Sequence, residues 1–169
     1  MIYVLTGNGK GKTTCALGMG LRAAGAGFNV LMVQFLKTGD SSENKIVKKI
    51  KNFKIRSFGR KGFAPFTEKD AALARQGFDF LKREAENHRL VIMDEINVAM
   101  KYKLIDVKKV ISFLNSQGKK RDIVLTGRYC PQEIIRKADL VTEFKEVKHY
   151  FKKACLRRQG VKARKGIEF

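Results

Sequence analysis

The residues with the clearest capacity for chemistry form a glycine-rich loop near the N-terminus, residues 7–14, GNGKGKTT. The loop follows an apolar run at residues 1–5 and leads into a segment rich in Ala and Leu, so it joins a predicted strand to a predicted helix over residues 12–25. Glycines permit a tight turn whose backbone N–H groups converge on an anion at the helix N-terminus. Lys12 can reach phosphate oxygens, and the Thr13 hydroxyl is placed to bind Mg²⁺. The sequence therefore predicts a nucleoside triphosphate site.

The loop departs from the usual phosphate-loop pattern, G-x-x-x-x-G-K-[ST]. That pattern requires glycine at position 6, where this chain has Thr6, and the first glycine, Gly7, comes one residue late. The loop is therefore either a shortened phosphate loop or a glycine-rich helix start with no ligand. The G-K-T-T ending between a strand and a helix favours the phosphate loop.

A pair of carboxylates, Asp94 and Glu95, follows the wholly apolar residues 90–93. Such a strand is expected to lie beside the first strand of a P-loop protein, where its terminal carboxylates face the nucleotide's metal. One carboxylate can hold Mg²⁺ (or Mn²⁺), and the other can activate water or complete the metal shell. The alternative is that the acids only cap the next helix. Which of the two binds metal directly stays open.

The remaining pattern alternates strands with helices. Further strands are expected at residues 29–35, 53–58, 122–125 and 140–144, with helices at about 67–87 and 106–117 and a short one after Pro131. Thr67 and Asp70 resemble a capping box, whereas residues 37–52 show no clear period. Because the strands are apolar throughout, the pattern predicts an α/β fold, one domain over residues 1–169 with a mostly parallel sheet covered on both faces.

Composition restricts the class of protein further. The chain has 169 residues, three scattered cysteines and no apolar run approaching the roughly 18 residues that span a bilayer, and it lacks a secretory signal pattern. These features predict a soluble cytoplasmic protein without a disulfide framework or membrane contact. Cys15 is expected to be packed rather than reactive.

The balance of charge is strongly basic, with 36 Lys and Arg against 16 Asp and Glu and a net charge of +20. Residues 44–61 carry eight basic groups and no acid, and residues 145–165 carry nine against Glu146 alone. Such clusters attract nucleic acid, nucleotide phosphates or acidic proteins. The alternative is an ordinary lysine-rich, solvated surface.

With the loop and the carboxylate pair in place, the whole chain resembles the ATP:corrinoid adenosyltransferases, the P-loop family of cob(I)alamin adenosyltransferases. The matching stretches occur in family order and are TGNGKGKTT (6–14), VQFLK (33–37), GF (62–63), MDEI (93–96), LTGR (125–128), ADLVTE (138–143), VKH (147–149) and KGIEF (165–169). The shortened loop is this family's own version of the motif.

The resemblance implies a RecA-like fold, a homodimer, and transfer of the 5′-deoxyadenosyl group of ATP to the cobalt of a corrinoid, with release of triphosphate. The nucleophile would be Co(I), and Lys12, Lys10 and Phe63 would be the catalytic residues. Thr13 and Glu95, with Asp94 second, are the implied metal ligands. The implied ATP contacts are Gly7, Asn8, Gly9, Lys10, Gly11, Lys12, Thr13, Thr14 and Arg128.

On the corrinoid side, Gly62 and Phe63 match the start of the loop with which the family displaces the lower axial ligand of cobalt. The family's tryptophan two residues later is Pro65 here, and Phe66 is expected to substitute for it. The alternative is that both phenylalanines are ordinary loop aromatics that pack on the core. Many members also carry a leading segment that covers the corrinoid. This chain starts at the first strand, so corrinoid enclosure, affinity or dimer exchange is expected to differ.

Three other polar residues have two interpretations each. Arg128 can contact phosphate or corrinoid, or pair with Asp122 or Asp139. Gln34 lines the site or caps a strand end. His149 contacts the nucleotide or a dimer interface, or is structural.

Two other functions use the same residues. A RecA-type ATPase acting with nucleic acid would use Glu95 as general base and the basic clusters as its footprint on the phosphate backbone. A non-catalytic corrinoid- or nucleotide-binding protein would bind without turnover. For the transferase, the positive charge suits an acidic flavodoxin-type reductant that supplies Co(I), and nucleic acid is not an expected partner.

Overall fold

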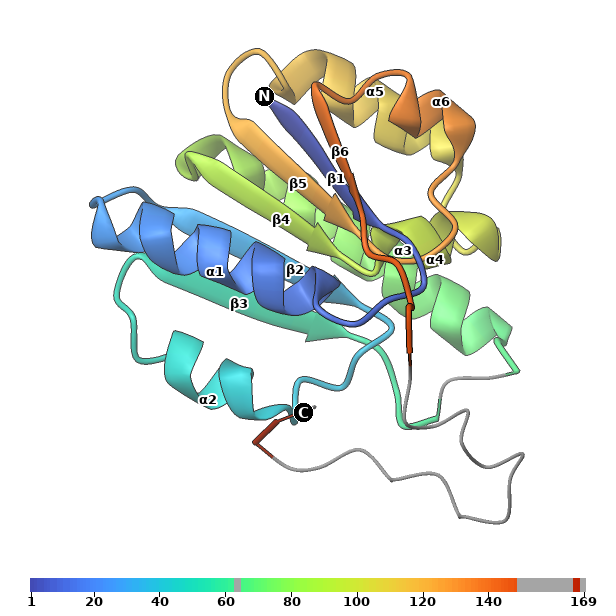
Figure 1. Ribbon diagram of the computed structural model, residues 1–169, viewed down its shortest axis with the longest axis horizontal. Helices are drawn as coiled ribbons and strands as arrows, with labels where there is room; N and C mark the ends of the chain where they lie inside the picture. The colour runs from blue at the N-terminus through green and yellow to red at the C-terminus, as the bar shows by residue number, and fades with distance from the viewer. Residues whose placement is uncertain (63–64, 149–165, 168–169) are drawn as a thin grey trace.

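Parallel strands form the centre of the protein, in the order β3-β2-β4-β5-β1-β6 (Figure 1). The computed structural model describes residues 1–62, 65–148 and 166–167. In this part of the chain every strand pairing is parallel, which confirms the predicted α/β class. The strands are β1 (Ile2–Thr6), β2 (Val30–Phe35), β3 (Phe53–Phe58), β4 (Leu90–Asp94), β5 (Asp122–Thr126) and β6 (Leu140–Glu143).

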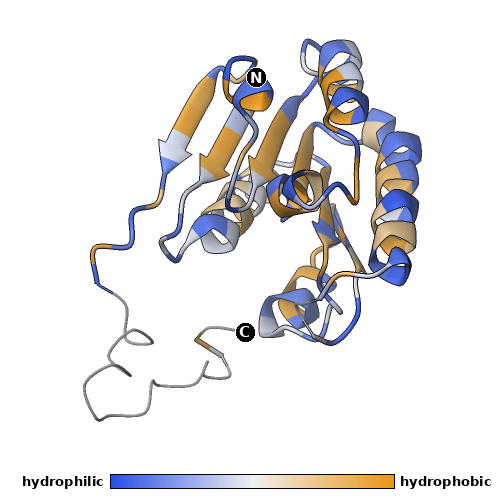
Figure 2. Ribbon diagram, turned by 90° about the vertical axis from the view of Figure 1, so that its right-hand side faces the viewer, coloured by the Kyte–Doolittle hydropathy of each residue, from blue (hydrophilic) through white to orange (hydrophobic). Residues whose placement is uncertain are grey.

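Helices cover both faces of the sheet, and each face has its own apolar core (Figures 1 and 2). One core includes residues of α1 and α2, and the other includes residues of α3, α4, α5 and α6. The helices are α1 (Lys12–Gly25), α2 (Ser42–Val47), α3 (Glu68–Glu84), α4 (Ile96–Lys101), α5 (Val107–Gln117) and α6 (Gln132–Ile135), with a 3₁₀ turn, η1 (Ala85–Asn87), after α3.

The central strands are apolar throughout because they are buried on both faces. In β4, Val91 and Met93 belong to one core, whereas Leu90 and Ile92 belong to the other. All residues of β2 and β4 are buried. Alternate side chains of one strand therefore stabilise opposite layers, as the sequence predicted.

The order of the strands corrects one expectation. β4 does not lie beside β1, because β5 is inserted between them and pairs with both. Strand order depends on long-range packing, which local apolar patterns do not report. The acidic pair at the end of β4 therefore reaches the loop after β1 across the end of β5, and this brings Thr126 into the site.

Two short helices and one cysteine also differ from expectation. The segment 37–52 contains α2, and α4 begins immediately after Glu95; each is six residues long, too short to show a helical period. Cys15 was expected to be packed but is exposed, because it lies on the outer side of α1. Among the described residues, no helix is both long and apolar enough to cross a bilayer.

The N-terminus of α3 has the predicted capping pair. The Asp70 carboxylate accepts hydrogen bonds from the backbone N–H and the hydroxyl of Thr67, at 2.7 and 2.9 Å. Arg60 forms a two-pronged ion pair with the same carboxylate, at 2.9 Å for both contacts. The hydrogen bond from Arg60 is the main cause that lowers the pKa of Asp70 to about 2. The Arg60–Asp70 pair thus ties the chain at Arg60 to the start of α3.

The Asp70→Asn variant is expected to lower the free energy of unfolding at pH 7 by about 1–2 kcal/mol, as the loss of a charged helix cap does. The folded-state pKa lies below the ordinary 3.8, so the contribution of Asp70 is present above about pH 4 and is lost as the pH falls toward 2. Urea unfolding across this pH range should show that the free energies of unfolding of the wild type and Asp70→Asn converge in acid. Asp79→Asn, which breaks an exposed pair with Lys82 on the same helix, should change little. An equal loss in both variants would contradict the assigned role.

Candidate functional site

The glycine-rich loop after β1 is held in a conformation that requires glycine. Gly7 and Gly11 have φ angles of +95° and +114°, in the left-handed region. A Cβ on Gly7 would lie 2.5 Å from the carbonyl oxygen of Phe144, just beyond β6. The Gly9 N–H donates to that same oxygen at 2.6 Å. The chain after β6 therefore fixes the loop at the carboxyl edge of the sheet.

Lys12 turns its ammonium group back into this loop. Its Nζ donates to the carbonyl oxygens of Gly7 and Gly9, at 2.8 and 2.7 Å. The residue is only 8% exposed, and burial lowers the pKa of the ammonium, against the attraction of Glu95. A buried cation bonded to two backbone carbonyls of the loop can exchange these oxygens for those of a phosphate.

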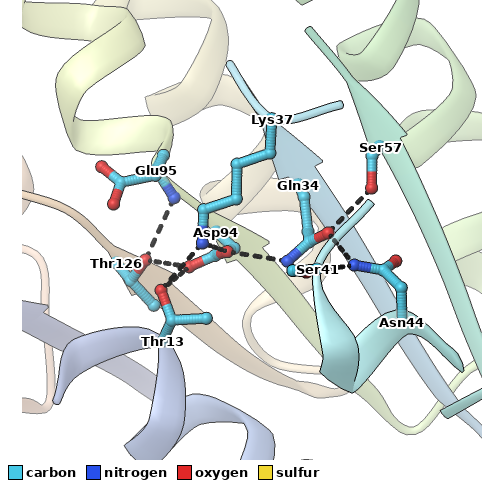
Figure 3. Close-up of polar contacts among 9 residues, drawn as sticks. All are labelled: Thr13, Gln34, Lys37, Ser41, Asn44, Ser57, Asp94, Glu95 and Thr126. Atoms are coloured by element: carbon cyan, nitrogen blue, oxygen red, sulfur yellow. Dashed lines mark hydrogen bonds and ion pairs between the residues drawn. The ribbon is translucent and has the colours of Figure 1, made fainter. Parts of the chain in front are cut away.

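A second polar cluster is centred on Asp94 at the end of β4 (Figure 3). The Asp94 side chain is fully buried. Its Oδ1 accepts from the hydroxyls of Thr13 (2.9 Å) and Thr126 (2.7 Å). Its Oδ2 accepts from Lys37 Nζ (2.7 Å) and Gln34 Nε2 (3.2 Å). We call these five residues the Asp94 junction; they join α1, β2, the chain after β2, β4 and β5.

Lys37 belongs to the Asp94 junction, and it was not identified as a site residue from the sequence. Its Nζ lies 3.0 Å from the Thr13 hydroxyl oxygen as well as 2.7 Å from Asp94. Burial alone would lower the pKa of Lys37, but attraction to Asp94 outweighs it and the pKa is raised. The only available signal was its position at the end of the VQFLK stretch, directly after a strand.

Gln34 connects the junction to α2 by a chain of hydrogen bonds. The side chain is fully buried, and its Oε1 accepts from Asn44 Nδ2 at 2.9 Å and from Ser57 Oγ at 2.7 Å. Asn44 Nδ2 also donates to Ser41 Oγ at 2.7 Å. Gln34 therefore lines the site, and its amide orientation is fixed by neighbours on both sides.

Glu95 is the N-cap residue of α4 and has a left-handed backbone, at φ +62°. Its N–H donates to the Thr126 hydroxyl at 3.0 Å, so one threonine holds both acidic residues. Burial raises the pKa of Glu95, and the neighbouring Asp94 charge adds to the effect. Its side chain lines a cavity of about 410 Å³ together with Val98, Tyr102, Arg128 and Tyr129.

Arg128 faces this cavity rather than the alternative partners considered from sequence. Asp122 pairs with Arg89 at 2.8 Å and with the N-terminal amino group at 2.9 Å. Asp139 accepts the backbone N–H of Ile2 at 2.6 Å. The glycine before Arg128 is required because its φ is +124° and a Cβ there would lie 3.2 Å from Glu95 Oε2. The Arg128 charge is felt at Lys12 and at Glu95.

Other residues expected at the site are exposed to solvent or packed against the core. Asn8, Lys10 and Thr14 are exposed, and Lys10 Nζ lies 3.5 Å from the carbonyl oxygen of Ile167 near the C-terminus. Phe66 is partly buried against the core, and its ring packs on Tyr102 with the centroids 4.8 Å apart.

The predicted corrinoid loop is described only in part. Gly62 lines a separate hollow of about 450 Å³ with Lys37 and Arg60. Phe63, His149 and most of the basic cluster at residues 145–165 lie outside the described residues.

The donor set fits a divalent cation that shares its shell with a nucleotide. Within residues 1–62, 65–148 and 166–167, no group of three or more His, Cys, Asp or Glu side chains could hold a metal alone. Thr13, Asp94 and Glu95 supply one hydroxyl and two carboxylates, all of them hard oxygen donors. Mg²⁺ is typically bound by one or two carboxylates together with substrate phosphates and water.

The fold and the loop together define a P-loop nucleotide-binding protein, with a buried lysine at the start of α1 and a buried acidic residue at the end of β4. Comparison with known proteins then gives the family. The family model described as ATP:corrinoid adenosyltransferase BtuR/CobO/CobP matches residues 1–169, and the chain belongs to this family.

Curated relatives agree with this assignment. A corrinoid adenosyltransferase of Escherichia coli strain K12 is 34% identical over 173 residues, which cover all of this chain and 85% of the relative. Corrinoid adenosyltransferase CobA of Salmonella typhimurium is 35% identical with the same coverage. A corrinoid adenosyltransferase of Sinorhizobium is 34% identical and is covered to 80%. A RecA-type ATPase acting on nucleic acid is therefore not favoured.

Thr126 offers a direct test of how the junction is held. Thr126→Val removes the hydroxyl that donates to Asp94 and accepts from the Glu95 N–H, so we expect a loss of about 2–3 kcal/mol in the free energy of unfolding. Thr126→Ser keeps the hydroxyl and should lose about 1 kcal/mol for the missing methyl group. Urea denaturation compares the two variants. If Thr126→Val proved as stable as Thr126→Ser, the hydrogen bonds of the Thr126 hydroxyl would not be the source of stability.

Proposed function

We propose that this chain transfers the 5′-deoxyadenosyl group of ATP to the Co(I) centre of a corrinoid, with residues 1–169 acting as one catalytic unit. The observation that supports this most is the shortened loop with its buried Lys12, joined to Asp94 through Thr13, in a chain matched to the family from end to end. Cob(I)alamin and cob(I)yrinic acid a,c-diamide are the proposed acceptors, in adenosylcobalamin biosynthesis or salvage.

The reaction needs positioning and charge more than a protein nucleophile. The electron pair of Co(I) forms a bond to C5′ of the ribose, the C5′–O bond breaks, and triphosphate leaves with that bonding pair. Cobalt becomes formally Co(III). The protein must therefore align C5′ with cobalt and stabilise negative charge that grows on the triphosphate. Lys12 and the loop N–H groups are suited to this task, and Lys10 is near enough along the loop to add a charge.

We assign the metal to Thr13, Asp94 and Glu95, with Mg²⁺ or Mn²⁺ as the ion. When bound, it supplies positive charge against the triphosphate. The protein's own part is to hold the ligands: Thr126 orients both acidic residues, and Gln34 donates to Asp94 Oδ2. The loop residues Gly7, Asn8, Gly9, Gly11 and Thr14, together with Arg128, complete the proposed ATP contacts.

For the corrinoid we propose the loop that contains Gly62 and Phe63, supported by Phe66. Phe66 packs on Tyr102, and Tyr102 also lines the cavity beside Glu95. An aromatic group at this position is suited to contact one face of a corrin macrocycle. Phe63→Ala should weaken transfer to a corrinoid while leaving ATP affinity unchanged.

Product analysis tests the proposed reaction. The protein is incubated anaerobically with ATP, Mg²⁺ and chemically reduced cob(I)alamin, and the products are separated by chromatography. Light-sensitive alkylcobalamin and triphosphate in equal amounts are expected. ADP and phosphate with the corrinoid unchanged would exclude the proposal. Repeating the assay with cob(I)yrinic acid a,c-diamide compares the two acceptors through kcat/KM.

Lys12→Met is expected to lower kcat/KM for ATP by at least about 100-fold, because a preorganised charge on the leaving group is lost. Steady-state kinetics with reduced cobalamin measure the effect, and a thermal melt checks folding. Lys120→Met, at an exposed position beyond α5, serves as the control and should match the wild type. Retention of most activity by Lys12→Met would contradict the assigned role.

A homodimer and an acidic flavodoxin-type reductant are the proposed partners. The net charge of +20 and the exposed lysines around α2 support electrostatic attraction to an acidic protein. Activity that depends on such a reductant should fall about tenfold between 50 and 300 mM salt, whereas activity with chemically reduced corrinoid should change little. Equal salt dependence in both assays would argue against the steering role. Light scattering tests the dimer.

A further inference from the structure

Lys37 holds a position that the metal proposed above would also need. Its ammonium group contacts the Thr13 hydroxyl oxygen at 3.0 Å and Asp94 Oδ2 at 2.7 Å. These two residues are proposed metal ligands, and they come from different elements, α1 and β4. A lysine and a divalent cation cannot both contact this pair of groups without strong repulsion.

A buried carboxylate such as Asp94 requires a cation. Three of its hydrogen-bond donors, Thr13, Gln34 and Thr126, are neutral. Lys12 is another cation near this site, but its ammonium is directed at the carbonyl oxygens of Gly7 and Gly9. Lys37, in direct contact with the carboxylate, therefore supplies positive charge against Asp94.

Lys37 also borders a hollow into which its side chain can move. The residue is 28% exposed at its side chain, and it lines the hollow of about 450 Å³ that also includes Asp40, Glu43, Arg60 and Gly62. Its long side chain can thus leave Asp94 without disturbing a core. The two acids in the hollow are alternative partners for the ammonium.

We propose that Lys37 is a positioning residue that occupies the cation site in the ligand-free protein and is displaced when the metal arrives with the nucleotide. This inference rests on the proposed function for the identity of the metal site. Lys37 holds the side chains of Thr13 and Asp94 in position, and it lowers the affinity of the site for free metal. Once displaced, its charge moves into the hollow beside Gly62, where the proposed corrinoid loop begins.

The test uses Mn²⁺ as the probe, in the absence of nucleotide and corrinoid. Electron paramagnetic resonance of free Mn²⁺ gives the dissociation constant of the full chain. Lys37→Met should bind Mn²⁺ at least about tenfold more tightly than the wild type, because the metal no longer competes with a charged hydrogen bond. Lys37→Arg, which keeps a cation, should retain the weak wild-type affinity.

The matched control is Lys54→Met. Lys54 forms an ion pair of the same length, 2.7 Å, with Glu84, between β3 and α3 and outside the junction. Its removal should leave Mn²⁺ affinity unchanged. Mn²⁺ affinity of Lys37→Met equal to or weaker than that of the wild type would overturn the proposal, as would the same gain in Lys54→Met.

A second measurement covers the case in which Lys37→Met fails to fold. Wild-type protein labelled with ¹³C at lysine Cε is titrated with Mg²⁺ and a non-hydrolysable ATP analogue, and Lys37→Arg identifies the Lys37 resonance by its absence. A large shift of that resonance, with little change at Lys54, is expected. A Lys37 resonance that stays in place when metal and nucleotide bind would overturn the proposal.

Failure of this inference can be separated from failure of the proposed function. ADP and phosphate as the products of the wild-type protein would exclude the proposed transferase function, but the competition between Lys37 and Mn²⁺ could still be measured. Conversely, triphosphate and alkylcobalamin from a protein whose Lys37 does not compete with Mn²⁺ would remove only the inference.

Discussion

The structure depends on one buried negative charge, the carboxylate of Asp94. It lies at the end of β4, a strand that is buried along its whole length, and such a charge is costly unless it is paired and hydrogen-bonded. The protein meets this requirement with donors from separate elements: Thr13 from α1, Gln34 from β2, Lys37 from the chain beyond β2, and Thr126 from β5. The arrangement of the sheet edge follows from the need to bring these groups together.

The insertion of β5 between β1 and β4 gives this arrangement its shape. Because β5 ends beside Asp94, its last residue, Thr126, can bond to Asp94 and to the backbone of Glu95 at once. The chain then turns at Gly127 so that Arg128 faces the cavity beside Glu95. On the other side, Gln34 connects the junction to α2 by its hydrogen bond with Asn44. The phosphate loop, the acidic pair and the hollow near Gly62 therefore form one connected network.

Much of this could be predicted from sequence, where the signal is local. The strand–loop–helix unit, the apolar strands and the Thr67–Asp70 cap follow from period, glycine placement and capping chemistry, which involve neighbouring residues. Strand order and the roles of Thr126 and Lys37 depend on which segments meet in space, and no single-sequence pattern reports that. The short helices α2 and α4 were missed because six residues do not establish a period. Cys15 was misjudged because an alanine-rich helix shows little contrast between its faces.

We infer that Thr13, Asp94 and Glu95 hold the metal of the bound nucleotide and that Lys37 occupies the Asp94 side of this site before binding. A crystal structure with Mn²⁺ and a non-hydrolysable ATP analogue tests this directly, because anomalous scattering at the manganese edge locates the ion. One strong anomalous peak is expected in contact with Thr13 and an acidic residue of the pair Asp94–Glu95, with Lys37 moved off Asp94. A peak elsewhere, or a peak beside Asp94 with Lys37 still bonded to it, would rule out this role of Lys37 and its neighbours.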